Sequence, residues 1–174
     1  MISLPLHGAI FSADRTRRLW LGRKVQDIES PRRLFICAVQ PSDADENSND
    51  PTIIRELGFA RRWGFGWLDK VNLFDLVSSD TDTLYASANP VTDENDAYVF
   101  AAAARCDLHL CAWGNHGAHM ARGARMRRLL TERNYSLHVL GLTKDGYPIH
   151  PLARGKKRVP DSAVPVPWAS AARK

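Results

Sequence analysis

The sequence has few cysteines and no long apolar segment. The three cysteines, Cys37, Cys106 and Cys111, are an odd number without a C-x-x-C pair, so neither a disulfide framework nor a zinc knuckle is expected. One of the longest apolar runs, Val99 to Ala104, has six residues, whereas a membrane-spanning helix needs about 20. The first residues contain no basic run followed by an apolar stretch, the pattern of a secretory signal. We therefore expect a cytoplasmic protein with reduced thiols that does not cross a membrane.

The composition excludes a fibrous, disordered or multidomain protein. The 174 residues are 44% hydrophobic and 25% charged, which is typical of one globular domain. The 24 basic and 19 acidic side chains give a net charge of +5, a balance that suits a polyanionic partner. The charges are unevenly distributed: Asp43 to Asp50 contains four acids and no base, whereas bases gather in residues 15–33, 122–133 and 154–158.

Hydrophobic periodicity predicts strands that alternate with helices. The predicted strands are residues 9–11, 18–21, 34–39, 70–74, 108–113 and 137–142, of which the first two form a hairpin. The predicted helices run from Asp50-Pro51 to Trp63-Gly64, from Thr92 through Ala104, and through Leu129-Leu130 in an Arg-rich segment. We expect a three-layer α/β/α sandwich with a mostly parallel four-stranded central sheet and an N-terminal β-hairpin. Residues 1–153 are predicted to form a single α/β domain, and residues 154–174 a basic tail rich in proline and alanine.

Two of the predicted helices begin with capping residues. Asp50 precedes Pro51, which predicts an N-cap followed by proline at the first helical position. Thr92 precedes Asp93 and Glu94, which predicts a second N-cap with acids in the first turn. Both starts follow a predicted strand, as a fold of alternating strands and helices requires.

Polar residues follow each of the four predicted core strands. They are Gln40, Pro41 and Ser42 after the first strand, Asn72 and Asp75 at the end of the second, Trp113, Gly114, Asn115 and His116 after the third, and His150 after the fourth. In an open parallel sheet, ligands bind beyond the carboxyl ends of the strands. We therefore expect these residues to form one ligand-binding site.

Several of these signals have more than one interpretation. The Asn72 amide, within an apolar strand, either pairs with a heterocycle or bridges neighbouring loops. His150 either donates a hydrogen bond to an anion or is an ordinary loop histidine. His116 and His119 have helical spacing, but no cysteine or carboxylate beside them completes a zinc site. Alternatively, residues 114–117 cradle a phosphate before a helix. We expect no metal and no cofactor.

Motifs spread over most of the chain resemble one bacterial family. In order, they are Pro41-Ser42, Asp50-Pro51-Thr52, Gly58 to Gly64, Val71 to Phe74, Asn89-Pro90-Val91, Glu94-Asn95-Asp96, Ala112-Trp113-Gly114, Leu140 to Thr143 and Pro148 to Leu152. On these residues the chain is identified as a member of domain-of-unknown-function family 1643. The family usually has Asn-Pro-Ser where this chain has Gln40-Pro41-Ser42. Membership implies no activity.

The order of the strand ends is also similar, more distantly, to the uracil-DNA glycosylase superfamily. The shared order is an acid or amide before proline, an asparagine on a strand, Trp-Gly and His-Pro. This resemblance implies a uracil-DNA-glycosylase-like fold in which Gln40 positions the attacking water, Asn72 reads a flipped base and His150 stabilises the leaving base. Gln40 fits the order but differs from the usual residues, because an amide cannot be a general base and glutamine is one methylene longer than asparagine, which would displace the water by about 1 Å.

The resemblance and the basic groups together predict recognition of a nucleobase or a nucleotide. The protein would resemble a DNA glycosylase in hydrolysing an N-glycosidic bond. Two alternatives stay open: a non-catalytic nucleotide or nucleic-acid binding module, and an enzyme that acts on free nucleotides. The expected partner is DNA or a nucleotide, and the predicted nucleic-acid contacts are Arg122, Arg125, Lys156 and Lys157.

Overall fold

Strand β3 (Arg33–Ala38) runs through the middle of the sheet, and after Arg33 its side chains are apolar on both faces. Leu34 and Ile36 pack into one apolar cluster, whereas Phe35 and Cys37 pack into the other. All four are fully buried. A strand that is apolar on both faces requires helices on both sides of the sheet.

The computed structural model describes residues 2–169. The other strands are β1 (Gly8–Phe11), β2 (Arg18–Lys24), β4 (Trp67–Asn72), β5 (Leu108–Cys111), β6 (Leu137–Val139) and β7 (Val166–Pro167). The α-helices are α1 (Pro51–Arg62), α2 (Thr81–Ala86), α3 (Asn95–Ala103) and α4 (Arg122–Glu132), and the 3₁₀ helices are η1 (Asn115–Ala121) and η2 (Gly155–Lys157). Within residues 2–169, each helix is too short or too polar to span a membrane.

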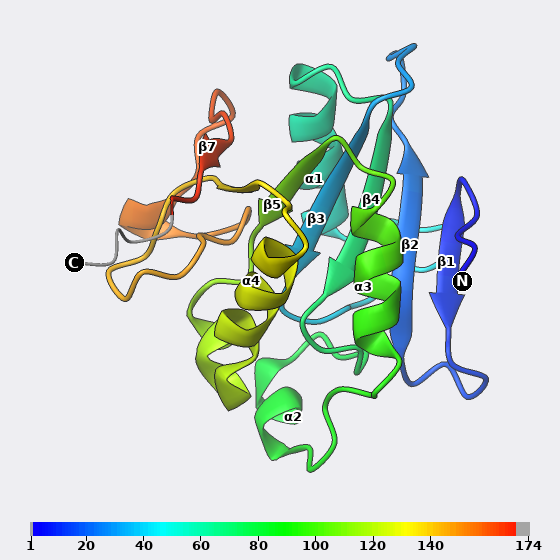
Figure 1. Ribbon diagram of the computed structural model, residues 1–174, viewed down its shortest axis with the longest axis vertical. Helices are drawn as coiled ribbons and strands as arrows, with labels where there is room; N and C mark the ends of the chain where they lie inside the picture. Colours follow the sequence, from blue (N-terminus) through cyan, green and yellow to red (C-terminus); the bar gives the residue numbers. More distant parts are fainter. Residues whose placement is uncertain (1, 170–174) are drawn as a thin grey trace.

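The strands form one mixed sheet in the order β1-β2-β4-β3-β5-β6-β7. Neighbouring strands from β4 to β6 are parallel. The pairs β1 with β2, β2 with β4, and β6 with β7 are antiparallel. In Figure 1, α3 and α4 lie in front of the sheet, α1 lies behind it, and α2 lies below its lower end.

This sheet contradicts the predicted fold. The prediction of a mostly parallel, four-stranded, uracil-DNA-glycosylase-like sheet with an added hairpin is wrong, because the sheet has seven strands with parallel and antiparallel pairs. The second strand of the hairpin pairs with β4, with Leu21 opposite Lys70, so the hairpin continues the sheet. Val166–Pro167, within the predicted tail, pairs with β6. Antiparallel strands thereby cover both edges of the parallel core, whose backbone groups need partners.

The helix starts differ in how well the sequence predicts them. The prediction for α1 is confirmed: the Asp50 side chain accepts a hydrogen bond from the backbone N–H of Ile53, and Pro51 begins the helix. The prediction for Thr92 is wrong, because α3 begins after Glu94 without a side-chain cap. The Thr92 hydroxyl instead donates to the buried carboxylate of Asp75. A tertiary partner therefore replaces the local cap.

A buried carboxylate on β4, Asp69, connects four parts of the chain. Its side chain is fully buried and accepts hydrogen bonds from Trp20 Nε1 at 2.7 Å and from the Arg33 guanidinium at 2.8 Å. Arg105, which follows α3, forms an ion pair with the same carboxylate. Arg105 also donates to the backbone carbonyl of Leu4 at 2.8 Å. Asp69 therefore ties β2, β3, the chain after α3 and the N-terminal segment to β4.

The turn before β4 has no room for a side chain. A Cβ atom at Gly66 would lie 1.9 Å from the backbone carbonyl oxygen of Ser30. We predict that Gly66→Ala lowers the free energy of unfolding by about 1–3 kcal/mol, because the backbone must shift to remove the overlap. Urea denaturation of the purified variant measures this loss.

Gly58→Ala is the matched control. Gly58 lies within α1, and a Cβ there would meet only the end of the Arg62 side chain, at 3.7 Å. Since alanine favours a helix over glycine, this variant should gain about 0.5–1 kcal/mol. Equal urea denaturation midpoints for Gly66→Ala and Gly58→Ala would contradict the steric explanation.

Candidate functional site

A cavity of about 370 Å³ opens where β3 and β5 end and α1 begins. Its walls include the loop before α2 and the loop after β6. Six of the predicted site residues line it: Gln40, Ser42, Trp113, Gly114, His116 and His150. They meet because parallel strands present their carboxyl ends at the same edge of the sheet. The volume lies near the lower end of small-molecule sites, which span about 300–1,000 Å³.

Gln40 holds the loop before α2 and keeps one free acceptor. Its Nε2 donates to the carbonyl oxygens of Ser78, at 2.8 Å, and Asp80, at 3.1 Å. Only the nitrogen end of an amide can donate to two carbonyls, so this contact fixes the orientation of the side chain. Its Oε1 is buried, and no partner for it exists among residues 2–169. An unpaired buried acceptor of this kind is costly until a ligand or a water donates to it.

His150 is a neutral hydrogen-bond donor. Burial, together with the nearby cation Lys70, lowers the pKa of His150 to about 4. The backbone N–H of Leu152 donates to Nδ1 of His150 at 3.1 Å. Since Nδ1 accepts, the single proton of the neutral ring lies on Nε2. His150 therefore supplies an uncharged N–H at the cavity.

Two cations on the cavity wall were not singled out from the sequence. Arg18 of β2 is buried, and its Nη1 donates to the backbone carbonyl of Ala44 at 2.6 Å. Burial lowers the pKa of Arg18 to about 10, so the guanidinium is still charged at neutral pH. Lys70 of β4 is also buried and forms an ion pair with Glu56 of α1. Each cation thus reaches the cavity from inside the fold.

Asp50 combines a structural role with a place on the cavity wall. Its carboxylate accepts from the Ser42 hydroxyl at 2.7 Å and from the backbone N–H of Ile53 at 2.8 Å. Burial alone raises the pKa of Asp50, but these hydrogen bonds and the cations Lys70 and Arg18 outweigh burial and lower it. Asp50 is therefore a carboxylate at neutral pH.

Charged residues at or beside the cavity leave a signal in the sequence. Glu56 lies three residues after Ile53 and four before Ala60, on the apolar face of α1. Lys70 directly precedes a segment that contains the buried apolar residues Val71, Leu73 and Phe74. A charged residue on an apolar face or beside a core strand is a signal of a buried charge. Arg18 carries the same signal, because it directly precedes the apolar residues Leu19, Trp20 and Leu21.

Two predicted site residues lie elsewhere. Asn72 is 2% exposed, and its backbone carbonyl accepts from Nδ2 of Asn95 at 3.1 Å. Asp75 is fully buried and accepts from Arg17 at 2.6 Å and from the backbone N–H of Thr92 at 3.0 Å. Neither residue lines the cavity. Asp75 connects the start of β2 to the segment before α3.

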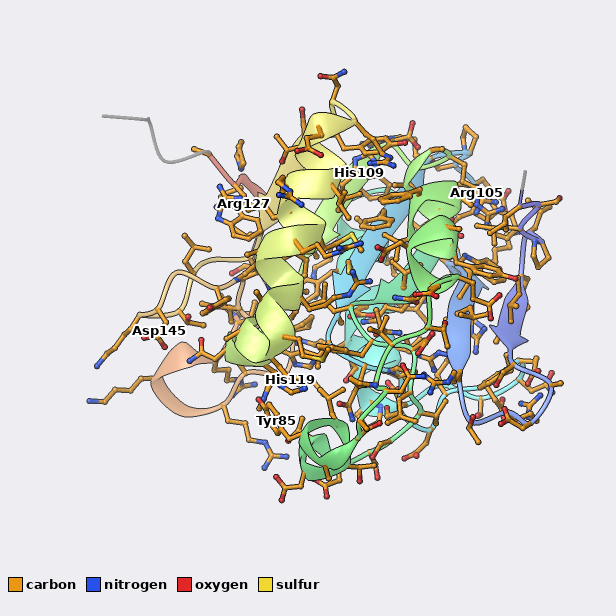
Figure 2. All side chains as sticks on the ribbon, turned by 60° about the horizontal axis from the view of Figure 1, so that its bottom comes forward. Tyr85, Arg105, His109, His119, Arg127 and Asp145 are labelled. Atoms are coloured by element: carbon orange, nitrogen blue, oxygen red, sulfur yellow. The ribbon has the colours of Figure 1, made fainter. Side chains whose placement is uncertain are left out.

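Pro41 and Asn115 also lie outside the cavity lining. The carbonyl of Pro41 accepts from the backbone N–H of Ser78 at 2.9 Å, so Pro41 helps to hold the loop before α2. Nδ2 of Asn115 donates to the exposed carboxylate of Asp145 at 2.8 Å, and Figure 2 labels this aspartate. The predicted roles of both residues in ligand binding stay predictions.

An aromatic contact joins α2 to η1 beside the cavity. The Tyr85 hydroxyl lies 2.7 Å from Nδ1 of His116, which lines the cavity. The Tyr85 ring also meets His119 edge-on, with 4.8 Å between ring centroids, and Figure 2 shows the two residues side by side. Within the described part of the chain, no group of three His, Cys, Asp or Glu side chains is arranged to hold a metal ion.

The predicted nucleic-acid contacts differ in their availability. Arg122 is 5% exposed; its Nε donates to the backbone carbonyl of Leu73 at 2.8 Å, and its guanidinium pairs with Asp96. Arg125 is exposed and lies 3.5 Å from Asp96. Lys156 is exposed, and the Lys157 side chain lies outside the described part of the structure. Arg122 therefore already has intramolecular partners for its donors.

The comparison with protein families supplies a match that spans the site. The family model "Protein of unknown function (DUF1643)" matches residues 18–152. The chain belongs to this family. The motif-based prediction of membership is confirmed, and the matched segment contains every cavity-lining residue from Arg18 to His150. Neither the comparison with curated proteins nor that with solved structures gives a match.

The lowered pKa of His150 gives this DUF1643 protein a pH-dependent stability. The folded-state pKa is about 4, against an ordinary value of 6.5. Between these values the unfolded chain binds more protons, so the free energy of unfolding should fall as the pH falls from 6.5 to 4. Urea denaturation across this range, together with an NMR titration of the imidazole, measures the effect.

A His150→Gln variant is the control, because it cannot take up the proton. The stability advantage of the unmodified protein over this variant should shrink on acidification. An imidazole resonance, assigned to His150 by its absence from the variant, that titrates near pH 6.5 would contradict the prediction.

Proposed function

We propose that this protein binds a single nucleobase or nucleoside in the cavity. The observation that carries the proposal is the mixture of free donors and acceptors. Gln40 Oε1 and Arg18 Nε are buried, and neither has a partner within residues 2–169, while His150 offers Nε2–H. An inorganic anion can only accept hydrogen bonds from the donors of the protein, whereas the edge of a nucleobase presents donors and acceptors together.

The charges at the cavity favour an uncharged ligand. Two cations, Arg18 and Lys70, and the carboxylate of Asp50 line the cavity, and the Glu56 carboxylate pairs with Lys70. The two positive and two negative charges balance. A phosphate group would compete with these carboxylates for the same cations. A nucleoside therefore suits the site better than a nucleotide.

Contacts outside the cavity favour a free ligand over a base within DNA. Arg122, a predicted phosphate contact, is buried and paired with Asp96. The hydrogen bond between Tyr85 and His116 holds α2 against η1 beside the cavity. A small free ligand needs neither a basic docking face nor a wide opening.

Thermal unfolding with a panel of ligands tests this proposal. We predict that at least one nucleoside raises the melting temperature, because a ligand at 100 times its Kd stabilises the folded state by about 2.7 kcal/mol. The matching 5′-monophosphate should have a smaller effect. Gln40→Leu should weaken nucleoside binding about tenfold, because the ligand loses an acceptor in a buried site.

Asn115→Leu provides a matched control, since it removes an amide that bonds to Asp145 outside the cavity. The affinity of this variant for the nucleoside should equal that of the unmodified protein. A different result would reject the proposal in favour of DNA recognition: nucleosides do not bind, whereas oligonucleotides bind with an affinity that falls steeply between about 50 and 200 mM salt.

Hydrolysis of the N-glycosidic bond is a second candidate function. A neutral N–H donor, His150, and a carboxylate, Asp50, line the same cavity. Water would form a bond to C1′ of the sugar as the bond to the base nitrogen breaks. The electron pair leaves with the base, which accepts a hydrogen bond from Nε2–H and takes up a proton lost by the water. Asp50 would stabilise the positive charge that develops on the sugar.

Chromatography of nucleoside incubations detects the released base. We predict release with the unmodified protein, and a rate about 100-fold lower with His150→Leu, because leucine has no donor and a hydrogen bond made in the transition state is lost. Nucleoside affinity should change less than the rate. Binding without any released base would reject hydrolysis and leave the binding function intact.

A further inference from the structure

Lys70 occupies a position where a charge is costly. In β4 it is paired with Leu21 of β2 on one side and with Ile36 of β3 on the other. The residue is 3% exposed, yet it contributes to the cavity lining. Among residues 2–169, the hydrogen-bond partner of its amine is Glu56 alone. A buried amine therefore borders the ligand space from the middle of the sheet.

The ion pair between Lys70 and Glu56 adds little stability to the fold beyond what a pair of apolar side chains could supply. Desolvation of two buried charges offsets much of their attraction, so apolar side chains of similar size are often at least as stabilising. The pair is also incompletely satisfied: Oε2 of Glu56 is buried, with no partner in the described chain. Incompletely paired charges beside a cavity are more typical of a reactive site than of a structural core.

We propose that Lys70 is a carbonyl-reactive lysine, whose Nζ forms an imine with a small aldehyde bound in the cavity, and that Glu56 carries the proton. The amine and the carboxylate are already in contact, so proton transfer needs no movement of the backbone. The aldehyde must be small and uncharged, because the charges around the cavity balance and its volume is about 370 Å³.

The steps balance as follows. Glu56 takes one proton from the Lys70 ammonium, which leaves a lone pair on Nζ. This pair forms a bond to the carbonyl carbon, the C=O π bond breaks, and a proton moves from nitrogen to oxygen. Glu56 returns its proton to the hydroxyl, which leaves as water while the C=N bond forms. Burial raises the pKa of Glu56 against the opposing effect of Lys70, which suits a carboxyl that takes up and returns a proton.

The class of aldehyde rests on the proposed function. If a nucleoside is hydrolysed in the cavity, C1 of the released sugar carries a hydroxyl and opens to an aldehyde. Lys70 and His150 line the same cavity, so this carbonyl would be generated beside the amine. A sugar aldehyde is therefore the expected natural partner, and a smaller aldehyde is a suitable probe.

Reductive trapping tests the proposal on the full-length protein. Glycolaldehyde serves as the probe, and sodium cyanoborohydride adds hydride to the imine and makes a stable secondary amine. Peptide mapping by mass spectrometry then locates the labelled lysines. We expect Lys70 to be labelled about tenfold faster than Lys24, although the Lys24 side chain is 54% exposed and that of Lys70 only 3% exposed.

Two variants serve as controls. Lys70→Arg keeps the positive charge beside Glu56 but cannot form an imine, so label should disappear from this position alone. Lys24→Arg removes an exposed lysine and should leave the labelling of Lys70 unchanged. The comparison between Lys70 and Lys24 within the unmodified protein needs no variant, so it stands even if Lys70→Arg fails to fold.

The same sample distinguishes failure of this inference from failure of the proposed function. A saturating nucleoside that protects Lys70 from labelling supports both. A nucleoside that binds while label appears only on exposed lysines overturns the role of Lys70 and leaves nucleoside binding intact. Fast labelling of Lys70 without any nucleoside binding supports the reactive lysine and rejects the proposed function.

Discussion

The fold depends on a single buried carboxylate, Asp69, and on the donors that surround it. Trp20 comes from β2, Arg33 from β3 and Arg105 from the chain after α3. A buried carboxylate is stable only when such partners are present, so these segments must assemble on β4 together. The hydrogen bond from Trp20 helps to hold β2 against β4, and the antiparallel pairing of these two strands turns a parallel core into a mixed sheet.

Lys70, the next residue along β4, has the opposite charge and lies on the opposite face of the sheet. Successive side chains of a strand point to alternate sides of the sheet, so Asp69 meets Arg105 on the side of α3, while Lys70 meets Glu56 on the side of α1. Asp69 has several donors and serves the fold. Lys70 has one buried partner and borders the cavity, so the less completely paired charge lies beside the proposed ligand site.

Local sequence signals explain most of the elements that were predicted. The apolar run of β3 and the cap formed by Asp50 and Pro51 depend on neighbours in sequence. Helix α2 was missed because it has six residues, of which only Leu84 is buried. Strand β7 was missed because it contains Pro167 and pairs with β6 far along the chain. The cap at Thr92 failed because Asp75 competes for the hydroxyl.

The sequence by itself determined the four core strands and six of the residues at the cavity, because the carboxyl ends of parallel strands share one edge. Only the tertiary structure decided that Arg18 and Lys70 border that cavity and that Asn72 and Asp75 do not. Strand periodicity assigns a side chain to a face of the sheet. Burial and charge pairing depend on what the other elements bring to that face, which no local pattern contains.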